Sequence, residues 1–327
     1  LRMAAALGFT PAVPFNKIHW GNDAAFDAMR TEPEFRVLNQ ELKRYERPIQ
    51  RSRVAFVLEE QGLEPEGIAY DELLNCFYLG SGARKKIIKV SPQGVATDFT
   101  GGQDGLDTVL GLHVDPIRRW LWVCSQTEAS TDVFRYDLVS GSLLKRYSLS
   151  RLEGNHSFND LAIHPSGDVY ITESIRDDIY LISHTRDRLE LFFSREPFVS
   201  FNGVAVSDDG ESLFVADALI GIYKVDLVSR DCVLLTHEPL FDSSNVDGLV
   251  FFRDHLYAVQ PGLNTVCRFG LNKDRSRITG RSVFEQNSVR LNWPTTGVIA
   301  GNSFYFIADT QGDSNGGHAV VMKTDLD

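Results

Sequence analysis

A short motif recurs six times along the chain, and it constrains the fold more than any other feature. Each copy has a variable opening residue, a second residue that is usually glycine, and then mostly apolar residues. The copies begin 43 to 49 residues apart. The six copies are Glu66-Gly67-Ile68-Ala69, Leu110-Gly111-Leu112-His113, Asn159-Asp160-Leu161-Ala162, Asn202-Gly203-Val204-Ala205, Asp247-Gly248-Leu249-Val250 and Thr296-Gly297-Val298-Ile299. A period in the forties with several short strands per period is typical of β-propeller blades.

Each of the first five repeats contains four short stretches rich in β-branched and aromatic residues, separated by turn residues. The sixth repeat ends after its third stretch, Val320–Lys323, whereas an unassigned stretch, Val54–Leu58, precedes the first motif. Pairing these two would close the ring and remove a free sheet edge. The sequence therefore predicts an all-β fold: a six-bladed β-propeller with four-stranded blades, closed by an N-terminal strand.

Two regions follow from this pattern: residues 51–327 form the propeller, and residues 1–50 form an N-terminal extension that could cap the channel mouth. Within the extension, Asn22 or Asp23 is expected to cap a short helix that runs to Arg30, and Glu34–Arg44 is a charged amphipathic stretch. The apolar segment Met3–Pro14 is either the remnant of an export signal or an arm, so the compartment is left open.

Composition excludes several classes of function. The 327-residue chain has a formal net charge of −11, whereas nucleic-acid binding needs a basic face. No apolar run reaches the roughly 18–20 residues of a membrane-spanning helix. The four cysteines lie in different repeats without C-x-x-C spacing, so buried free thiols are expected rather than a zinc site. A small molecule is the expected partner.

Oxygen-bearing side chains open four of the six motifs. Glu66, Asn159, Asn202 and Asp247 share one phase of the repeat, and radial symmetry would gather them on the propeller axis. Asn and Asp could instead simply form turns at strand starts, but Glu66 is a poor turn residue. Two carboxylates and two amides without His or Cys suit Ca²⁺ better than Mg²⁺. We predict a metal site for Ca²⁺, with another divalent cation as the alternative.

The same residues resemble a known family. Pro65-Glu66-Gly67, Phe158-Asn159-Asp160, Phe201-Asn202-Gly203-Val204 and Val246-Asp247-Gly248 look like the motifs of the senescence-marker-protein, gluconolactonase and luciferin-regenerating-enzyme family. The resemblance spans residues 51–327 and implies a six-bladed propeller with calcium-dependent hydrolase activity. It places the metal ligands on Glu66, Asn159, Asn202 and Asp247, and makes Asp247 a base or nucleophile. Arg84 and Arg118 are candidates for the family's substrate-binding arginine.

The expected reaction is hydrolysis of a lactone. Ca²⁺ would polarise the carbonyl, and Asp247 would activate the attacking water or attack directly. Asp160 either orients Asn159 or serves as an alternate base. His156 either shuttles a proton or lies on a surface loop, and the remaining histidines, including His113 and His164, are interpreted as structural.

Two other functions stay open at this point. Phosphotriester hydrolysis could use the same metal, and a ligand-binding propeller could hold a structural calcium without turnover.

Overall fold

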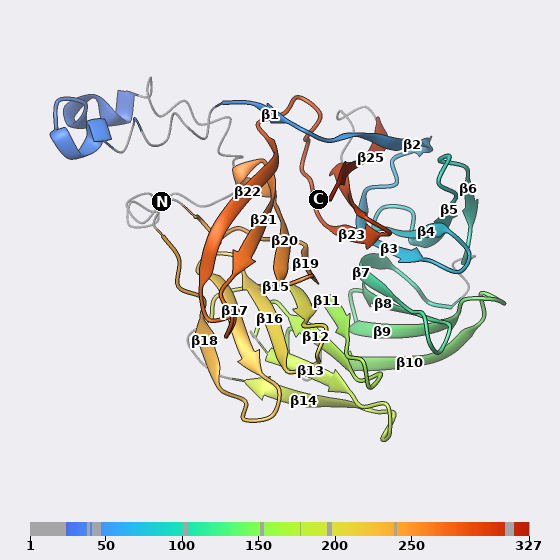
Figure 1. Cartoon of the computed structure of the whole chain (residues 1–327). Helices are drawn as coiled ribbons and strands as arrows, with labels where there is room; N and C mark the ends of the chain where they lie inside the picture. The colour runs from blue at the N-terminus through green and yellow to red at the C-terminus, as the bar shows by residue number, and fades with distance from the viewer. Residues whose placement is uncertain are drawn as a thin grey trace.

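The structure is a computed structural model that describes residues 24–37, 40, 47–100, 104–150, 154–176, 178–194, 198–238, 241–310 and 317–326. Six antiparallel sheets surround a common centre, and β3, β7, β11, β15, β19 and β23 are the innermost strands (Figure 1). The predicted six-bladed β-propeller is therefore confirmed. None of the helices within these ranges is long and apolar enough to cross a bilayer.

The first three blades follow the chain from the inside outward. Blade 1 contains β3 (Pro65–Asp71), β4 (Cys76–Ser81), β5 (Lys86–Val90) and β6 (Ala96–Asp98). Blade 2 contains β7 (Thr108–Asp115), β8 (Trp120–Gln126), β9 (Ser130–Asp137) and β10 (Leu143–Ser150). Blade 3 contains β11 (Phe158–Ile163), β12 (Val169–Glu173), β13 (Asp178–Ile182) and β14 (Leu189–Ser194).

The last three blades repeat this order. Blade 4 contains β15 (Phe201–Val206), β16 (Ser212–Asp217), β17 (Gly221–Asp226) and β18 (Cys232–Leu234). Blade 5 contains β19 (Leu249–Phe252), β20 (His255–Gln260), β21 (Thr265–Leu271) and β22 (Ile278–Gln286), with the short 3₁₀ helix η4 (Pro261–Leu263) between β20 and β21. Blade 6 contains β23 (Gly297–Ala300), β24 (Ser303–Asp309) and β25 (His318–Asp325).

The N-terminal strand β2 (Arg53–Gln61) completes blade 6 as its outermost strand. It pairs antiparallel with β25, and Val54 lies opposite Met322. This pairing confirms the closure predicted from counting strands. A further short strand, β1 (Ile49–Gln50), pairs with β22 on the outer edge of blade 5.

Two segments of the extension are described ahead of β1: the 3₁₀ helix η2 (Ala24–Met29) and the helical residues 33–37. Figure 1 shows the η2 region outside the ring of blades. The proposed helix cap at Asn22 or Asp23, the segment Met3–Pro14 and most of Glu34–Arg44 lie outside the described residues. A cap over the channel therefore stays a prediction.

Apolar clusters between neighbouring blades hold the ring together, as expected when each blade buries both faces of its sheet. Between blades 6 and 1, Phe77 packs against Tyr305 with ring centroids 4.7 Å apart, and between blades 4 and 5 Phe214 stacks on Phe251 at 5.4 Å. All four cysteines are free thiols, as predicted, and three of them are buried (Cys76, Cys124 and Cys267).

Polar contacts join successive blades at the turns that follow the innermost strands. Arg119 in the β7–β8 turn forms a two-pronged ion pair with the fully buried Asp71 at the end of β3. The next four pairs of blades each have a hydrogen bond or ion pair at this end, formed by Arg118 with the Ser166 carbonyl, His164 with the Gly210 carbonyl, Asp209 with Arg275 of the β21–β22 turn, and Arg253 with Asn302. Because the innermost strands run away from the six motifs, these contacts lie at the opposite end of the propeller from the motif openings.

Candidate metal centre

The six motifs stand where the innermost strands pair irregularly. In blades 1 to 4 the register with the second strand shifts across the motif: between Pro65 and Ile68, Val109 and Leu112, Phe158 and Leu161, and Phe201 and Val204. Such a bulge leaves residues out of the ladder and redirects a side chain. In these four blades the opening side chain can therefore point to the axis instead of into a neighbouring blade. In blades 5 and 6 the opening residues Asp247 and Thr296 precede β19 and β23.

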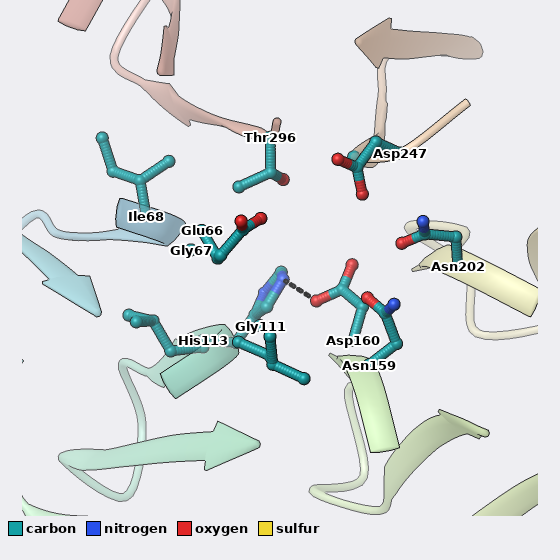
Figure 2. Close-up of a pocket in the computed structure, with 13 residues that line it drawn as sticks. Glu66, Gly67, Ile68, Gly111, His113, Asn159, Asp160, Asn202, Asp247 and Thr296 are labelled. Atoms are coloured by element: carbon teal, nitrogen blue, oxygen red, sulfur yellow. Dashed lines mark ion pairs between the residues drawn. The ribbon is translucent and has the colours of Figure 1, made fainter. Parts of the chain in front are cut away.

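The opening residues of all six motifs line one cavity of about 220 Å³ at the centre of the ring. Figure 2 shows Glu66, Asn159, Asn202 and Asp247 pointing into this cavity from four different blades. The structure thus brings together the four side chains that the sequence singled out. Their role as metal ligands stays a prediction.

Close backbone approach between neighbouring innermost strands keeps the cavity narrow. A Cβ atom on Gly203 would lie 2.3 Å from the Asp247 carbonyl oxygen and 2.7 Å from the Leu249 nitrogen. Glycine at the second motif position is therefore required for the fourth blade to meet the fifth at this distance.

The two carboxylates among the four candidate ligands, Glu66 and Asp247, are destabilised in their charged form by their surroundings. Burial, and after it the charge of Glu64, raises the pKa of Glu66 to about 7. Burial, followed by repulsion from Glu66 and Asp160, raises the pKa of Asp247 well above its usual range, although a hydrogen bond from Asn202 acts in the opposite direction. No Lys or Arg is among the described residues that line the cavity, so no basic side chain there offsets this charge.

This donor set fits a hard divalent cation. Carboxylate and amide oxygens are the ligands that Ca²⁺ prefers, and a cation between Glu66 and Asp247 would relieve the repulsion that raises their pKa values. Within the described part of the chain, no three His, Cys, Asp or Glu side chains are grouped so that they could hold a metal. A metal in this cavity would therefore need the amides of Asn159 and Asn202.

Asp160 occupies the second motif position, where the other five blades have glycine. Its Oδ1 accepts the N–H of Leu161 at 2.9 Å, and its Oδ2 accepts the N–H of Val204 in blade 4 at 3.4 Å. Burial raises its pKa to about 7, against the lowering effect of these two hydrogen bonds. The carboxylate is thus held between blades 3 and 4 at the cavity wall.

His113 is the cavity residue that the sequence analysis missed. Its Nε2 lies 4.0 Å from Oδ1 of Asp160, as the dashed line in Figure 2 marks, and burial lowers its pKa to about 4. The signal was present in the repeat, because the fourth motif position is Ala, Val or Ile in the other five blades. A polar residue at that single position distinguishes blade 2.

Three other candidates lie outside the cavity lining. His156 is buried, with its ring edge-on to Tyr180, so its interpretation as a surface-loop residue is wrong. Arg118 binds Asp115 and the Ser166 carbonyl at the opposite end of the propeller, and Arg84 donates to the Gln61 carbonyl. Neither arginine therefore contacts the cavity from the position it takes here.

Comparison with known proteins finds similarity in fold but no match in sequence. No protein-family model and no curated protein sequence matches it. Among solved structures, a calcium-binding protein, regucalcin, from Agrobacterium tumefaciens matches with a TM-score of 0.62 and 17% identity, covering 84% of this chain and 93% of that one.

Two further structures match to a similar degree. A gluconolactonase from Xanthomonas campestris gives a TM-score of 0.61 at 14% identity over 85% of this chain and 96% of that one. A luciferin-regenerating enzyme gives 0.60 at 14% identity over 82% and 93%. At these identities the likeness shows a shared propeller fold, and function has to be argued from the cavity.

Proposed function

We propose that this propeller is a calcium-dependent hydrolase whose substrate is a lactone. One observation carries the proposal: two carboxylates with raised pKa values and two amides converge from four blades on a single cavity. Their raised pKa values mean that the pair is stabilised by a positive charge brought into the cavity. The gluconolactonase and the calcium-binding regucalcin that share the fold add support for the choice of substrate and metal.

Glu66, Asn159, Asn202 and Asp247 would hold the ion. When bound, calcium would supply Lewis-acid polarisation of the ester carbonyl. Asp247 would accept a proton from the attacking water, because its carboxylate faces the cavity that would hold the ion. Asp160 is the alternate base, but its two backbone hydrogen bonds favour a role in orienting its neighbour Asn159.

A lactone panel with and without calcium tests the proposal. Purified protein should hydrolyse at least one δ- or γ-lactone with added Ca²⁺, lose the activity in a chelator and regain it when Ca²⁺ is restored. Asp247→Asn should keep the fold and abolish turnover. Full activity of this variant would remove Asp247 from the mechanism.

The same experiment separates the two remaining functions. Turnover of a phosphotriester with no turnover of lactones would assign the metal to chemistry at phosphorus. Stoichiometric calcium binding without turnover of either substrate class would instead indicate a binding propeller with a structural ion.

A further inference from the structure

Thr172 on β12 connects the backbone of Asp160, the residue after the candidate ligand Asn159, with the backbone of the candidate ligand Asn202. Its hydroxyl accepts the N–H of Asp160 at 3.1 Å and donates to the carbonyl of Asn202 at 2.7 Å, with the Asp160 carbonyl a second acceptor at 3.2 Å. The Thr172 side chain is fully buried. One hydroxyl thus ties the motif of blade 3 to the motif of blade 4.

These backbone groups lie in the irregular part of the innermost strands. Register shifts between Phe158 and Leu161 and between Phe201 and Val204 take both motifs out of the regular ladder. Buried backbone groups that leave a ladder need other partners, and a bulge is held in shape by whatever supplies them. Thr172 supplies such a partner to both motifs.

The repeat shows that the propeller does not need this hydroxyl in order to close. Thr172 follows Ile171, the partner of Leu161 in the third motif position. The residues at the equivalent place in the other five blades are Gly80, Cys124, Ala216, Val259 and Phe306, and none of them has a hydroxyl. A threonine there is specific to the blade that carries Asn159 and that adjoins the blade carrying Asn202.

Amide ligands depend on placement more than carboxylates do. A carboxylate attracts a cation through its full charge from many directions, whereas a neutral amide contributes only when its oxygen faces the ion. Asn159 and Asn202 are the two neutral members of the candidate set, and Figure 2 shows them on adjacent blades. Fixing the distance between their backbones therefore fixes how well both can reach one ion.

We propose that Thr172 is a positioning residue that sets the affinity of the cavity for a divalent cation: it fixes the backbone of Asp160, and with it the adjoining Asn159, relative to the backbone of Asn202. The inference rests on the proposed role of these two amides as ligands. It adds a residue that does not itself line the cavity.

Calorimetric titration with Ca²⁺ tests it on three variants of the full chain. Thr172→Val removes the hydroxyl and keeps the shape, and it should weaken Ca²⁺ binding about tenfold, the size expected for a residue that supports metal ligands. Thr172→Ser restores the hydroxyl and should bind within about twofold of the wild type. Thr265→Val is the matched control, because Thr265 is also fully buried and donates to a backbone carbonyl, that of Leu263, away from the cavity.

The outcomes separate this inference from the proposed function. Calcium binding by Thr172→Val that equals that of the wild type, or that is weakened no more than in Thr265→Val, overturns the role of Thr172 alone. A wild-type protein that binds no Ca²⁺ overturns the proposed function and this inference with it. If the valine variant does not fold, Thr172→Ala is judged by the same criterion, since alanine stands at the equivalent position of blade 4.

Discussion

Glu66 from blade 1 and Asp247 from blade 5 line the same cavity, where burial and then the charge of Glu66 raise the pKa of Asp247. Two like charges held together without a basic neighbour retain protons more strongly than in water. This relationship makes the protonation of the cavity, the stability of the metal-free protein and the binding of a cation depend on one another.

Calcium binding should release protons. Near pH 6 Glu66 is mostly protonated in the folded, metal-free protein, because its pKa is about 7, and burial with the charges of Glu66 and Asp160 also raises the pKa of Asp247 well above its usual range. A bound cation would displace these protons, so we expect release of about one proton or more per Ca²⁺. Calorimetric titration at pH 6 in two buffers of different ionisation enthalpy measures this number. Equal binding enthalpies in the two buffers would contradict it.

Glu66→Gln should lower the affinity for Ca²⁺ and raise the stability of the metal-free protein. Loss of one carboxylate should weaken Ca²⁺ binding at least about tenfold. In chelator the same change should stabilise the protein, by about 1–3 kcal/mol at pH 8, because a raised folded pKa lowers stability as pH rises through it. This gain should disappear at pH 4, where Glu66 is protonated in the folded state.

Urea unfolding of the metal-free variant and wild type at the two pH values measures the difference. Glu59→Gln is the matched control, since Glu59 is an exposed residue of β2 and should change neither property. A Glu66→Gln variant that binds Ca²⁺ as the wild type does would remove Glu66 from the ligand set.

The repeat made most of the fold predictable. Six copies of one strand pattern fix the number of blades, and the missing strand of the last copy identified β2 as its partner. The four oxygen-bearing residues were found for the same reason, because equivalent positions in a ring converge on its axis. The placement of Arg118 was not predictable in this way, since its turn follows the end of β7 and its side chain binds both Asp115 in that strand and the Ser166 carbonyl in blade 3.

His113 and Thr172 are polar residues that the repeat motif alone does not single out. Each occupies a position where the other five blades have a residue without the same polar group, and each acts across the boundary between two blades. Such contacts depend on how neighbouring sheets pack, which one strand pattern does not contain. Comparing the blades position by position would have identified both residues as exceptions.

Arg119→Ala should destabilise the ring at the end opposite the cavity. Burial raises the pKa of Asp71, but hydrogen bonds and charge from Arg119 outweigh this, and the net pKa is lowered. Removing Arg119 leaves a fully buried carboxylate without its partner, at a cost of about 3 kcal/mol at pH 7. A lowered folded pKa stabilises only above the unfolded pKa of about 4, so the cost should shrink as pH falls below that value.

Urea unfolding at pH 7 and pH 3 measures both parts of the Arg119 prediction. Arg53→Ala is the control, because the Arg53–Asp325 pair is exposed on both sides and its loss should cost much less stability than the loss of Arg119. Equal losses for the two variants at pH 7 would show that burial of Asp71 does not matter.

Gly111→Ala should distort the cavity from blade 2. A Cβ atom on Gly111 would lie 2.3 Å from Oδ1 of Asp160 and 2.9 Å from the Asn159 carbonyl oxygen. The methyl group must displace the segment that carries Asn159, so we expect a stability loss of about 1–3 kcal/mol. Since the displaced segment holds a candidate ligand, Ca²⁺ affinity should fall as well.

Gly280→Ala is the matched control, because no heavy atom lies within 4 Å of its added Cβ. Thermal unfolding in chelator and calorimetry with Ca²⁺ distinguish the two effects: a Gly111→Ala protein that is less stable yet binds Ca²⁺ normally would place Asn159 outside the metal site.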